Sequence, residues 1–444
     1  MESVSDRQMI ESPLRVEGVV TPPGDKSVSQ RALLLNSIAN GKSHISNLCE
    51  GDDRTSILRC LIGLGADISE ISTCSTHTNT ECYEVVGNGP SGLTEPSEVL
   101  NAGNSGTTMR LVSGILSGQP FLSVISGDRS LNARPMDRIV QPLTKMGAQI
   151  IGRCNSSLAP LAIRGGNLSG IDYKMEIPSA QVKSSLMIAA LYAKGHTTIT
   201  QPAQSRDHTE RMLNSMGANI QIDGLRVIVG ESDLTAVDTE VPSDISAAAF
   251  WLIAGCCHPN ARIRINRVGI NPTRAGVLKV LESMGANIRL ENLRDEGGEP
   301  EADIIAETSD LVGTEVGGDM IATVIDELPV LSLAASLAKG TTVITDAAEL
   351  RVKESDRIKA TVDGLSRLGA NVKERSDGML IHGVQRLVGS ECDSYGDHRI
   401  AMTMGIAGLL ASGTTTVKDA HSAAISYPNF WNTLYDLSSS SPNS

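Results

Sequence analysis

The sequence predicts an α/β protein built from six similar units that are shared equally between two lobes. Two short patterns recur along the chain, their copies lie at similar intervals, and two proline-containing segments separate the copies into two groups. Repeats in which helices alternate with strands, and in which the helices are buried together, form α/β architectures.

The first pattern is a run of small residues, a turn at glycine or asparagine, and then β-branched residues. Glycine at the end of a helix adopts the left-handed capping conformation, and threonine, valine and isoleucine favour a following strand. The copies of this pattern are residues 38–45, 116–118, 193–199, 338–343 and 411–417, with a degenerate copy at 257–263.

The second pattern is a Gly-Ala pair that ends one helix and precedes another strand. The glycines of this pattern are Gly65, Gly147, Gly217, Gly285 and Gly369. Successive glycines lie 82, 70, 68 and 84 residues apart. A sixth copy would lie at 430–437, so units of about 74 residues fill the chain. We expect each unit to run helix, strand, helix, strand, with a short hairpin added.

Two proline-containing crossings divide these units into lobes. The crossings are Thr21–Gly24 and Thr239–Ser243, with three units between them and three after the second. We therefore predict a discontinuous lobe one, residues 1–21 plus 242–444, and a continuous lobe two, residues 22–241. Two lobes joined by a two-stranded hinge imply an active site in the cleft between them.

Composition indicates a globular protein, and we expect it to be cytoplasmic. Of the 444 residues, 40% are hydrophobic and 20% are charged, which is the balance of a soluble protein with more than one core. The longest apolar run, 247–257, is too short to span a membrane. The N-terminus, with Glu2, Asp6 and Glu11, does not resemble a signal peptide.

Cysteine spacing and net charge exclude several kinds of site. The eight cysteines form no C-x-x-C pair, so the sequence predicts no zinc or other metal site and no disulfide framework. A net charge of −13 and 2% aromatic residues argue against a nucleic-acid surface, which requires a basic field and stacking rings. Any bound anion must therefore be held by a local cluster of cations.

The most informative cluster is the segment 350–357, which carries Arg351, Lys353, Glu354, Asp356 and Arg357. If this segment opens a helix, Lys353 and Arg357 lie four residues apart on one face with Glu354 beside them. A substrate anion and an acid or base could then meet there. The alternative is a solvated helix face with ion pairs inside the segment.

Two further clusters have the character of helix N-termini that bind anions. The segment 23–31 contains Lys26 and Arg31 after a glycine turn, and the segment 101–110 contains glycines followed by Arg110. Free backbone N–H groups and the helix dipole favour anions at such starts. Neither segment has the spacing of a Walker A loop, and a simple helix cap is the alternative for each.

The remaining clusters offer groups that recognise carboxylates and phosphates. Arg134 precedes a proline and is expected to be extended, and Arg399 follows a turn at 395–397. The segments 179–183 and 205–208 supply hydroxyl, amide and guanidinium groups. Arginine is favoured over lysine where a planar anion is held by two bonds at once.

Taken in order along the chain, these segments resemble the 5-enolpyruvylshikimate-3-phosphate synthases, a family of enolpyruvyl transferases. The motifs that carry the resemblance span almost the whole chain and are Lys26-Ser27 with Arg31, 104–110, Arg134-Pro135-Met136, 179–181, Asp326-Glu327-Leu328-Pro329, 350–357 and Asp397-His398-Arg399. The resemblance implies a two-lobed inverted α/β barrel of six βαβαββ repeats, three per lobe. It also implies transfer of the enolpyruvyl group of phosphoenolpyruvate to the 5-hydroxyl of shikimate 3-phosphate, with release of phosphate. That reaction belongs to the shikimate pathway, which leads to chorismate and the aromatic amino acids.

The resemblance further implies the residues of the site. Those expected to bind shikimate 3-phosphate are Lys26, Ser27, Arg31, Ser179, Ala180, Gln181, Ser205, Arg206, Asp326 and Lys353. Those expected to bind phosphoenolpyruvate are Lys26, Gly106, Arg134, Gln181, Arg357 and Arg399. The addition needs a base for the hydroxyl and an acid for the methylene carbon, and we assign these roles to Asp326 and Glu354. Lys26 would assist proton transfer or stabilise developing charge.

The resemblance implies no cofactor and no metal. The expected partners are the two small-molecule substrates, with no nucleic acid and no membrane, and the expected assembly is a monomer. The sequence departs from well-known relatives in lacking a lysine just before Tyr427-Pro428, for which Lys418 is a candidate replacement. Leu111 stands after Arg110 where those relatives have proline, which puts sensitivity to the inhibitor glyphosate in doubt.

Two alternatives remain open at this point. One is the sister enolpyruvyl transferase that acts on UDP-N-acetylglucosamine, which typically needs a reactive cysteine. Cys154 and Cys82 have the rough position for that cysteine but lack the flanking pattern. The other is a non-catalytic protein that binds a phosphorylated metabolite, against which the pair Asp326 and Glu354 argues.

Overall fold

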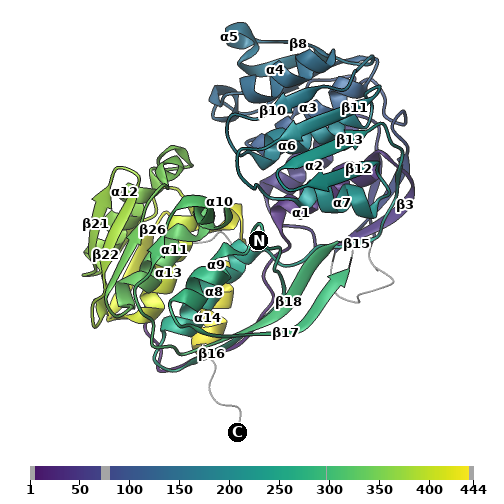
Figure 1. Ribbon diagram of the computed structural model, residues 1–444. Helices are drawn as coiled ribbons and strands as arrows, with labels where there is room; N and C mark the ends of the chain where they lie inside the picture. Colours follow the sequence, from purple (N-terminus) through teal and green to yellow (C-terminus); the bar gives the residue numbers. More distant parts are fainter. Residues whose placement is uncertain (1–5, 72–80, 297, 440–444) are drawn as a thin grey trace. The chain divides into compact units, whose positions relative to one another are not determined.

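The computed structural model describes residues 6–71, 81–296 and 298–439, which divide into two compact units (Figure 1). Unit 1 comprises Met1–Pro23, Ser243–Arg294 and Pro300–Ser444, and unit 2 comprises Gly24–Pro242 with Asp295–Glu299. Each unit has its own hydrophobic core.

The described residues of unit 2 form three sheets of the same design. In each sheet one strand runs parallel to its neighbour, and a hairpin continues antiparallel from that neighbour, in the orders β14-β3-β5-β4, β6-β7-β9-β8 and β10-β11-β13-β12; β15 also pairs with β3. The strands are β3 (Ala39–Ser46), β4 (Asp67–Ile71), β5 (Cys82–Asn88), β6 (Leu100–Asn101), β7 (Leu122–Ser126), β8 (Gln149–Gly152), β9 (Leu158–Arg164), β10 (Asp172–Lys174), β11 (His196–Thr200), β12 (Ile220–Asp223), β13 (Arg226–Gly230), β14 (Leu234–Thr235) and β15 (Thr239–Glu240).

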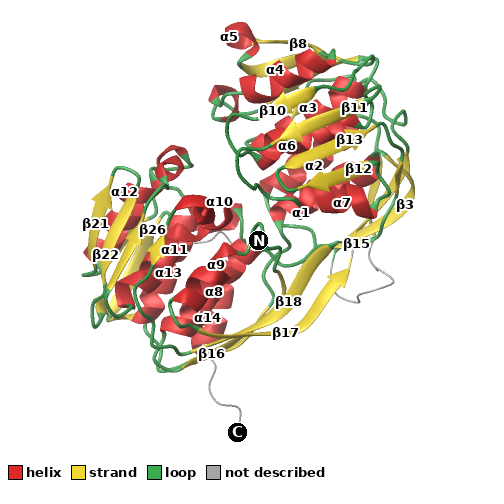
Figure 2. Cartoon of the chain, viewed as in Figure 1, coloured by secondary structure: helices red, strands yellow, loops and turns green. Residues whose placement is uncertain are grey.

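Three helices of unit 2 are buried on all sides after their first turns, which are less covered. These inner helices are α1 (Lys26–Ser37), α3 (Gly106–Gly118) and α6 (Ala180–Ala190). Small and apolar residues make up most of their circumference, and the polar side chains among them, such as Gln30, Arg31 and Lys183, are also buried. Figure 2 shows helices and sheets layered together in this unit. Each inner helix starts at a capping side chain, Asp25, Ser105 or Ser179, which fixes where its first turn begins.

The outer helices of unit 2 cover the inner layer with one face only. They are α2 (Asp52–Gly63), α4 (Asp137–Met146) and α7 (His208–Ser215), and α5 (Arg153–Ser156) is a single turn in the β8–β9 connection. In α2, the residues Ile57, Cys60 and Leu61 are buried at spacings of three and four, as expected for an amphipathic helix.

Unit 1 repeats the same design with one difference. Its sheets have the orders β17-β18-β16-β2, β19-β20-β22-β21 and β1-β26-β24, with a small β23-β25 pair. In the last sheet the N-terminal strand β1 pairs antiparallel with β26, so the beginning of the chain completes the C-terminal repeat. The strands are β1 (Arg7–Glu11), β2 (Val16–Val20), β16 (Ala261–Gly269), β17 (Asn287–Glu296), β18 (Glu299–Glu307), β19 (Glu315–Val316), β20 (Thr341–Ile344), β21 (Asn371–Arg375), β22 (Gly378–His382), β23 (Leu387–Val388), β24 (Glu391–Asp393), β25 (Ala411–Ser412) and β26 (Thr414–Lys418).

The helices of unit 1 also divide into an inner and an outer set. The inner helices are α8 (Ile245–Cys257), α11 (Leu328–Leu337) and α13 (His398–Leu410), and the outer ones are α9 (Gly276–Ser283), α12 (Arg357–Arg367) and α14 (Phe430–Ser439), with a short α10 (Ile321–Val324) before α11. The inner helix α8 is buried along nearly its whole length. The predicted α/β fold of six repeats is therefore confirmed.

The Gly-Ala pairs lie where the sequence places them. Their five glycines all adopt left-handed backbone conformations, with φ between 80° and 118°. Each ends an outer helix, and the next strand begins within a few residues. A side chain is strained at such φ values, which explains why glycine recurs at this point of each repeat.

Two features differ from what the sequence led us to expect. Residues 247–257 are not the longest apolar stretch, and one described cysteine is disulfide-bonded. The helical stretch Gly318–Leu337, with 20 residues and a mean hydropathy of 1.6, is long and apolar enough to cross a membrane, although 67% of it is buried inside the protein. It is broken by 3₁₀ turns into short pieces that end in the inner helix α11, so its apolar character reflects burial in the core of unit 1.

Cys82 is disulfide-bonded, whereas Cys154 and the other described cysteines are free.

Candidate active site

The first inner helix of unit 2 begins at predicted site residues. The Asp25 carboxylate caps α1 by accepting a hydrogen bond from the Val28 amide at 2.9 Å, so the helix starts at Lys26 and continues with Ser27. The Lys26 ammonium lies 3.2 Å from the Asp53 carboxylate of α2. Burial alone would raise the pKa of Asp53, but the charge of Lys26 and nearby hydrogen-bond donors outweigh burial and lower that pKa.

Arg31, one turn further along α1, is enclosed by hydroxyl groups. Its guanidinium donates from Nε to Thr209 Oγ1 at 2.7 Å, from Nη2 to Ser184 Oγ at 2.9 Å, and from Nη1 to the Ser27 carbonyl oxygen at 2.9 Å. Burial, more than any neighbouring charge, lowers the pKa of Arg31 to about 10. The group is still a cation at neutral pH, and its orientation is fixed by three bonds.

The second inner helix presents a glycine beside two guanidinium groups. The Ser105 hydroxyl caps α3, so Gly106 is its first residue. A methyl group at Gly106 would lie 2.9 Å from Nη1 of Arg110 and 3.6 Å from Nη1 of Arg134. Burial, together with the charge of Arg134, lowers the pKa of Arg110 to about 10. The glycine therefore keeps space open next to two cations.

The third inner helix is tied to the second by an amide. Ser179 caps α6, and Ala180 and Gln181 form its first turn. The Gln181 amide accepts a hydrogen bond from Arg110 and donates one to Thr107 Oγ1 at 2.9 Å. The N-termini of α3 and α6 are therefore adjacent, and the side chains of Gln181 and Arg110 lie together between them.

The loop between β11 and α7 carries the last two predicted residues of unit 2. Ser205 is buried and donates its hydroxyl hydrogen bond to Gln201 Oε1 at 2.5 Å. Arg206 lies close enough to Arg31 for its charge to contribute, after burial, to lowering the pKa of Arg31. Gln30 joins α1 to α3 by donating to Ser105 Oγ at 3.0 Å. Unit 2 thus brings together its predicted site residues, which are Lys26, Ser27, Arg31, Gly106, Arg134, Ser179, Ala180, Gln181, Ser205 and Arg206.

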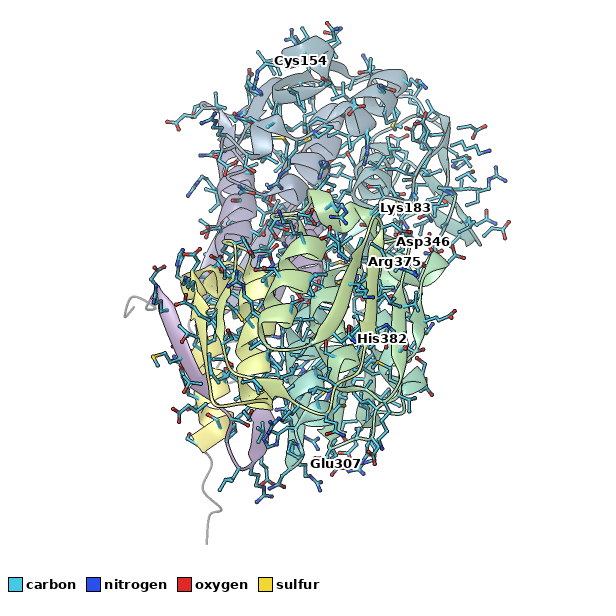
Figure 3. All side chains as sticks on the ribbon, turned by 90° about the vertical axis from the view of Figure 1, so that its left-hand side faces the viewer. Cys154, Lys183, Glu307, Asp346, Arg375 and His382 are labelled. Carbon is cyan, nitrogen blue, oxygen red and sulfur yellow. The ribbon has the colours of Figure 1, made fainter. Side chains whose placement is uncertain are left out.

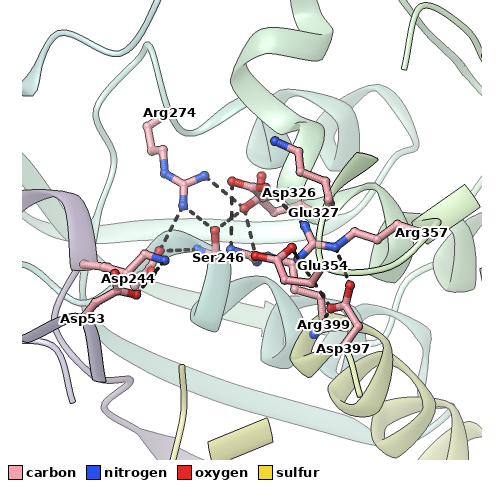
Figure 4. A network of polar contacts seen from close by, with 12 residues as sticks. Asp53, Asp244, Ser246, Arg274, Asp326, Glu327, Glu354, Arg357, Asp397 and Arg399 are labelled. Atoms are coloured by element: carbon pink, nitrogen blue, oxygen red, sulfur yellow. Dashed lines mark hydrogen bonds and ion pairs between the residues drawn. The ribbon is translucent and has the colours of Figure 1, made fainter. Parts of the chain in front are cut away.

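In unit 1 the centre of the predicted site is Arg357, the first residue of α12 (Figure 4). Its buried guanidinium donates to Asp397 at 2.8 Å, to Glu354 at 2.5 Å and to Asp326 at 3.4 Å. Burial would lower the pKa of Arg357, but these three carboxylates outweigh burial and raise it. Burial likewise opposes ionisation of Glu354, yet Arg357 and His398 lower its pKa, so its carboxylate is ionised at neutral pH.

Asp326 faces two cations and does not cap a helix. It lies in the 3₁₀ turn Ile325–Glu327 that precedes α11, and the residue at the cap position, Glu327, makes no capping bond. The Asp326 carboxylate lies 3.4 Å from Arg357 and 4.0 Å from Arg399. Glu327, and not Asp326, therefore occupies the cap position of α11.

The segment 350–357 does not open a continuous helix. A 3₁₀ turn ends at Val352, Lys353 has an extended backbone, and α12 begins only at Arg357. The prediction that Lys353 and Arg357 share one helix face is wrong, because Asp356 caps α12 by accepting from the Lys359 amide at 3.1 Å. A capping side chain competes with helix continuation and sets the start one residue later.

The three cationic side chains of this segment differ in their partners and in their burial. Arg351 lies 2.8 Å from Asp356 inside the segment, and Lys353 lies 3.0 Å from Glu349 just before it, with both cationic side chains 25% exposed. Arg357 alone points inward. Lys418, the suggested replacement for a C-terminal lysine, pairs with Glu391 at 2.5 Å on the β24–β26 edge.

Sequence reasoning missed a group of buried ionic residues behind the predicted ones. Glu327 is fully buried, and its carboxylate lies 3.1 Å from Arg274 and 3.9 Å from Arg399. Arg274 in turn lies 3.3 Å from Asp244, the cap of α8 (Figure 4). The sequence did contain a sign of these residues, because Glu327 directly follows the predicted site residue Asp326, and Asp397 stands two residues before the predicted site residue Arg399.

One group of possible metal ligands occurs among the described residues, and it does not include a predicted site residue. Asp6, Asp419 and His421 each offer a ligand atom within 4.8 Å of the others. Two of the three are exposed, and exposed acidic groups commonly cluster without a metal.

The two units offer complementary chemistry. Unit 2 presents cations, hydroxyls and an amide at helix N-termini, where the dipole adds positive potential for phosphate and carboxylate groups. Unit 1 presents two guanidinium groups together with Asp326 and Glu354, which can accept and return protons.

Comparison with known proteins agrees with this chemistry. The family model described as EPSP synthase (3-phosphoshikimate 1-carboxyvinyltransferase) matches residues 10–434. A 3-phosphoshikimate 1-carboxyvinyltransferase of Synechococcus sp. is 51% identical over 432 residues, which are 96% of each protein. One from Citrifermentans bemidjiense is 48% identical over 94% of this chain and 96% of that protein.

A solved structure gives the same result for the fold. The EPSP synthase of Acinetobacter baumannii superposes with a TM-score of 0.89 at 41% identity, covering 97% of this chain and 98% of that one. The agreement in sequence and in structure extends over nearly the full length of both chains. The chain therefore belongs to the EPSP synthase family.

Proposed function

We propose that this protein is a 3-phosphoshikimate 1-carboxyvinyltransferase of the shikimate pathway. It transfers the enolpyruvyl group of phosphoenolpyruvate to the 5-hydroxyl of shikimate 3-phosphate and releases phosphate. The observation that carries this proposal is the cluster in unit 1, where Asp326 and Glu354 flank the buried guanidinium of Arg357. Family membership over residues 10–434 supports the same reaction.

Substrate binding follows from the positions of the cations. Both substrates are polyanions, so they need several cations and helix N-termini at once. Arg31, Arg206 and the hydroxyls of unit 2 hold shikimate 3-phosphate. Arg357 and Arg399 hold the carboxylate of phosphoenolpyruvate, and Lys26 and Arg134 hold its phosphate, with Gln181 and Gly106 beside them.

The proton transfers fall to the two carboxylates. In the addition step, Asp326 accepts the proton of the 5-hydroxyl while the oxygen attacks the second carbon of phosphoenolpyruvate. The methylene carbon receives a proton from Glu354 and becomes a methyl group. In the elimination step a methyl proton returns to Glu354, the carbon–oxygen bond to phosphate breaks, and the double bond re-forms. Asp326 gives the proton it took from the 5-hydroxyl to the departing phosphate. Lys26 stabilises charge that develops on the departing phosphate.

The pairing of Glu354 explains how it becomes an acid. Arg357 holds the pKa of Glu354 below its usual value, after burial is overcome, so the carboxylate starts ionised. When the substrate carboxylate takes a place on Arg357, less of that cation's charge acts on Glu354. Its pKa then rises, because the neighbouring positive charge that lowered it is partly neutralised by the substrate.

We further propose that one active site uses both sets of residues, because neither unit alone carries both the acid–base pair and the phosphate-binding helix starts. The lobes predicted from the sequence, residues 1–21 plus 242–444 and residues 22–241, correspond to these sets. We also propose that the enzyme is a cytoplasmic monomer that needs no cofactor. The cytoplasmic location is compatible with the bacterial relatives named for this biosynthetic step.

The two rival functions have less support. The UDP-N-acetylglucosamine enzymes typically need a reactive cysteine, but Cys82 is disulfide-bonded here. Cys154 lies at the end of unit 2 far from Lys183, which is the neighbour of Ser205 (Figure 3). A protein that only binds the metabolite would not need an acid–base pair, which Asp326 and Glu354 can form beside Arg357.

The test is an assay of the purified protein for phosphate release with three acceptor conditions. Phosphoenolpyruvate with shikimate 3-phosphate should give steady turnover, and UDP-N-acetylglucosamine or buffer in place of shikimate 3-phosphate should give none. Binding of shikimate 3-phosphate without turnover would favour the non-catalytic function, and turnover with the nucleotide sugar would favour the sister enzyme.

A further inference from the structure

The inner helix α6 and the outer helix α7 of unit 2 are joined by a double contact that the reaction itself does not require. On one side, Lys183 Nζ of α6 lies 2.5 Å from Glu210 Oε1 of α7. On the other, Ser184 Oγ lies 2.6 Å from Thr209 Oγ1. Adjacent residues of one helix thus pair with adjacent residues of the other, and we name these four residues the α6–α7 clamp.

The ion pair of the clamp lies fully inside the protein. The side chains of Lys183 and Glu210 are 0% and 3% exposed. Burial shifts both groups toward their neutral forms, lowering the pKa of Lys183 and raising that of Glu210, with each partner opposing the shift of the other. The second carboxylate oxygen of Glu210 is buried with no hydrogen-bond partner among the described residues.

Such a pair is a poor device for stability alone. Desolvating two charges offsets most of their attraction, and well-packed apolar residues of the same volume often serve a core as well or better. An unsatisfied buried oxygen adds a further cost. The arrangement therefore calls for a role in holding something in place.

The clamp contacts two groups that the proposed function assigns to shikimate 3-phosphate, the Arg31 guanidinium and the Ser205 loop. Thr209 and Ser184 accept the hydrogen bonds from Nε and Nη2 of Arg31 at 2.7 and 2.9 Å. Lys183 Nζ lies 3.4 Å from the carbonyl oxygen of Ser205, the residue before Arg206. The clamp residues follow Ser179 and Gln181 in α6, so one rigid unit fixes the guanidinium, the loop and the helix start together.

We infer that the α6–α7 clamp positions Arg31 and the Ser205–Arg206 loop for the phosphorylated substrate. This inference rests on the proposed function, because it takes shikimate 3-phosphate as the ligand of those groups. The four clamp residues are positioning residues, since they act through Arg31 and Ser205. Removing part of the clamp leaves these binding groups present but no longer held in the geometry that a phosphate requires.

The decisive variants change the clamp without removing a binding group. Thr209→Val keeps the shape of the side chain but deletes the acceptor for Arg31 Nε, and Thr209→Ser restores that hydroxyl. The double variant Lys183→Met with Glu210→Leu removes both charges at once, so that no buried charge is left unpaired. Ser117→Ala is the matched control, because its buried hydroxyl bonds to the Ser113 carbonyl at 2.8 Å at the far end of α3.

The measurements are calorimetric binding of shikimate 3-phosphate, KM for each substrate, kcat and Tm. Thr209→Val and the double variant should weaken shikimate 3-phosphate binding by about tenfold or more, as expected when a charged group loses a held hydrogen bond. KM for phosphoenolpyruvate at saturating shikimate 3-phosphate should not change. Thr209→Ser and Ser117→Ala should bind shikimate 3-phosphate as the wild type does.

The possible failures are distinguishable. If the wild-type protein does not bind shikimate 3-phosphate, the proposed function fails. If the wild type binds it and Thr209→Val binds equally well, the clamp has no positioning role. An equal rise in KM for both substrates, or the same loss in Ser117→Ala, would reduce the clamp to general support of the core and overturn the inference.

Discussion

Asp326 is the residue whose removal should separate chemistry from binding. Replacing it by alanine takes away the proposed base, so kcat should fall by about 10²- to 10⁴-fold or more, while shikimate 3-phosphate binding weakens only modestly. Arg357 keeps Asp397 and Glu354 as partners, so the cluster should persist. Steady-state kinetics and calorimetry measure the two effects, with the exposed Asp319→Ala as control. Near-normal turnover in Asp326→Ala would remove this residue from the mechanism.

Gly106 should control discrimination between phosphoenolpyruvate and glyphosate. The added methyl of Gly106→Ala would lie 2.9 Å from Arg110 Nη1 and would force that guanidinium to move. The longer inhibitor should suffer more than the compact substrate, and a steric difference of one methyl is worth about 1–3 kcal/mol. We expect the inhibition constant for glyphosate to rise at least tenfold more than KM for phosphoenolpyruvate, with KM for shikimate 3-phosphate as internal control. Equal weakening of both ligands would show that Gly106 does not adjoin the donor.

The buried pair of Asp397 with Arg357 should make stability depend on pH. Burial opposes ionisation of Asp397, but Arg357 outweighs it and lowers its pKa. A lowered pKa contributes stability that is fully present above the unfolded value, about 4, and is lost as pH falls through the folded value. Asp397→Asn should be less stable than wild type by about 3–5 kcal/mol at pH 7, and less of that difference should remain at pH 3. Urea unfolding at both pH values tests this, and a constant difference would contradict the linkage.

The inner helices show what local sequence could and could not predict. Their caps at Asp25, Ser105 and Asp397 follow from residue type and position, and the glycine turns follow from repetition. The start of α12 was misplaced because Asp356 and the preceding charged residues fit both a helix and its cap. Helix boundaries depend on which of these competing bonds forms, and tertiary contacts decide that.

Close packing of two inner helices should make one glycine intolerant of any side chain. A methyl at Gly114 of α3 would lie 2.5 Å from the Ser185 carbonyl oxygen of α6, which is backbone and cannot swing away. Gly114→Ala should therefore destabilise the protein by about 1–3 kcal/mol, as overpacking does in a dense core. At Gly63 the nearest atom is the flexible end of Leu100 at 3.1 Å, so Gly63→Ala is the control. Equal Tm values for the two variants would refute the backbone contact.

Across the whole chain, the predicted site residues were identified largely through the family resemblance. The buried partners that hold these residues in place were not predicted. Arg31 and Thr209 are 178 residues apart in sequence, and Arg357 and Asp397 are 40 apart. A local sequence pattern does not predict which buried side chain an arginine will contact when the two are far apart in the sequence. The repeats did predict the α/β units, because each carries the same helix ends and strands, but they carry no information on the contacts of single side chains.

The division of labour between the units leads to a prediction for the complete protein. If Arg31 in unit 2 and Arg357 in unit 1 serve one ligand pair, the cations of both sets repel until an anion lies between them. Shikimate 3-phosphate should then draw the units together, and the radius of gyration measured by X-ray scattering should decrease at saturation. Inorganic phosphate at the same ionic strength should produce less compaction, because it cannot bridge both sets.

The control variant for this experiment is Arg31→Met, which keeps the apolar stem but loses the hydrogen bonds to Ser184 and Thr209. Its radius of gyration should not decrease at shikimate 3-phosphate concentrations that compact the wild type, since a ligand shifts an equilibrium only through its differential affinity for the two states. An unchanged radius of gyration in a wild-type protein that calorimetry shows to be saturated would mean that the ligand does not bring the two units together. The acid–base pair of unit 1 would then have to reach the substrate without a change in the spacing of the units.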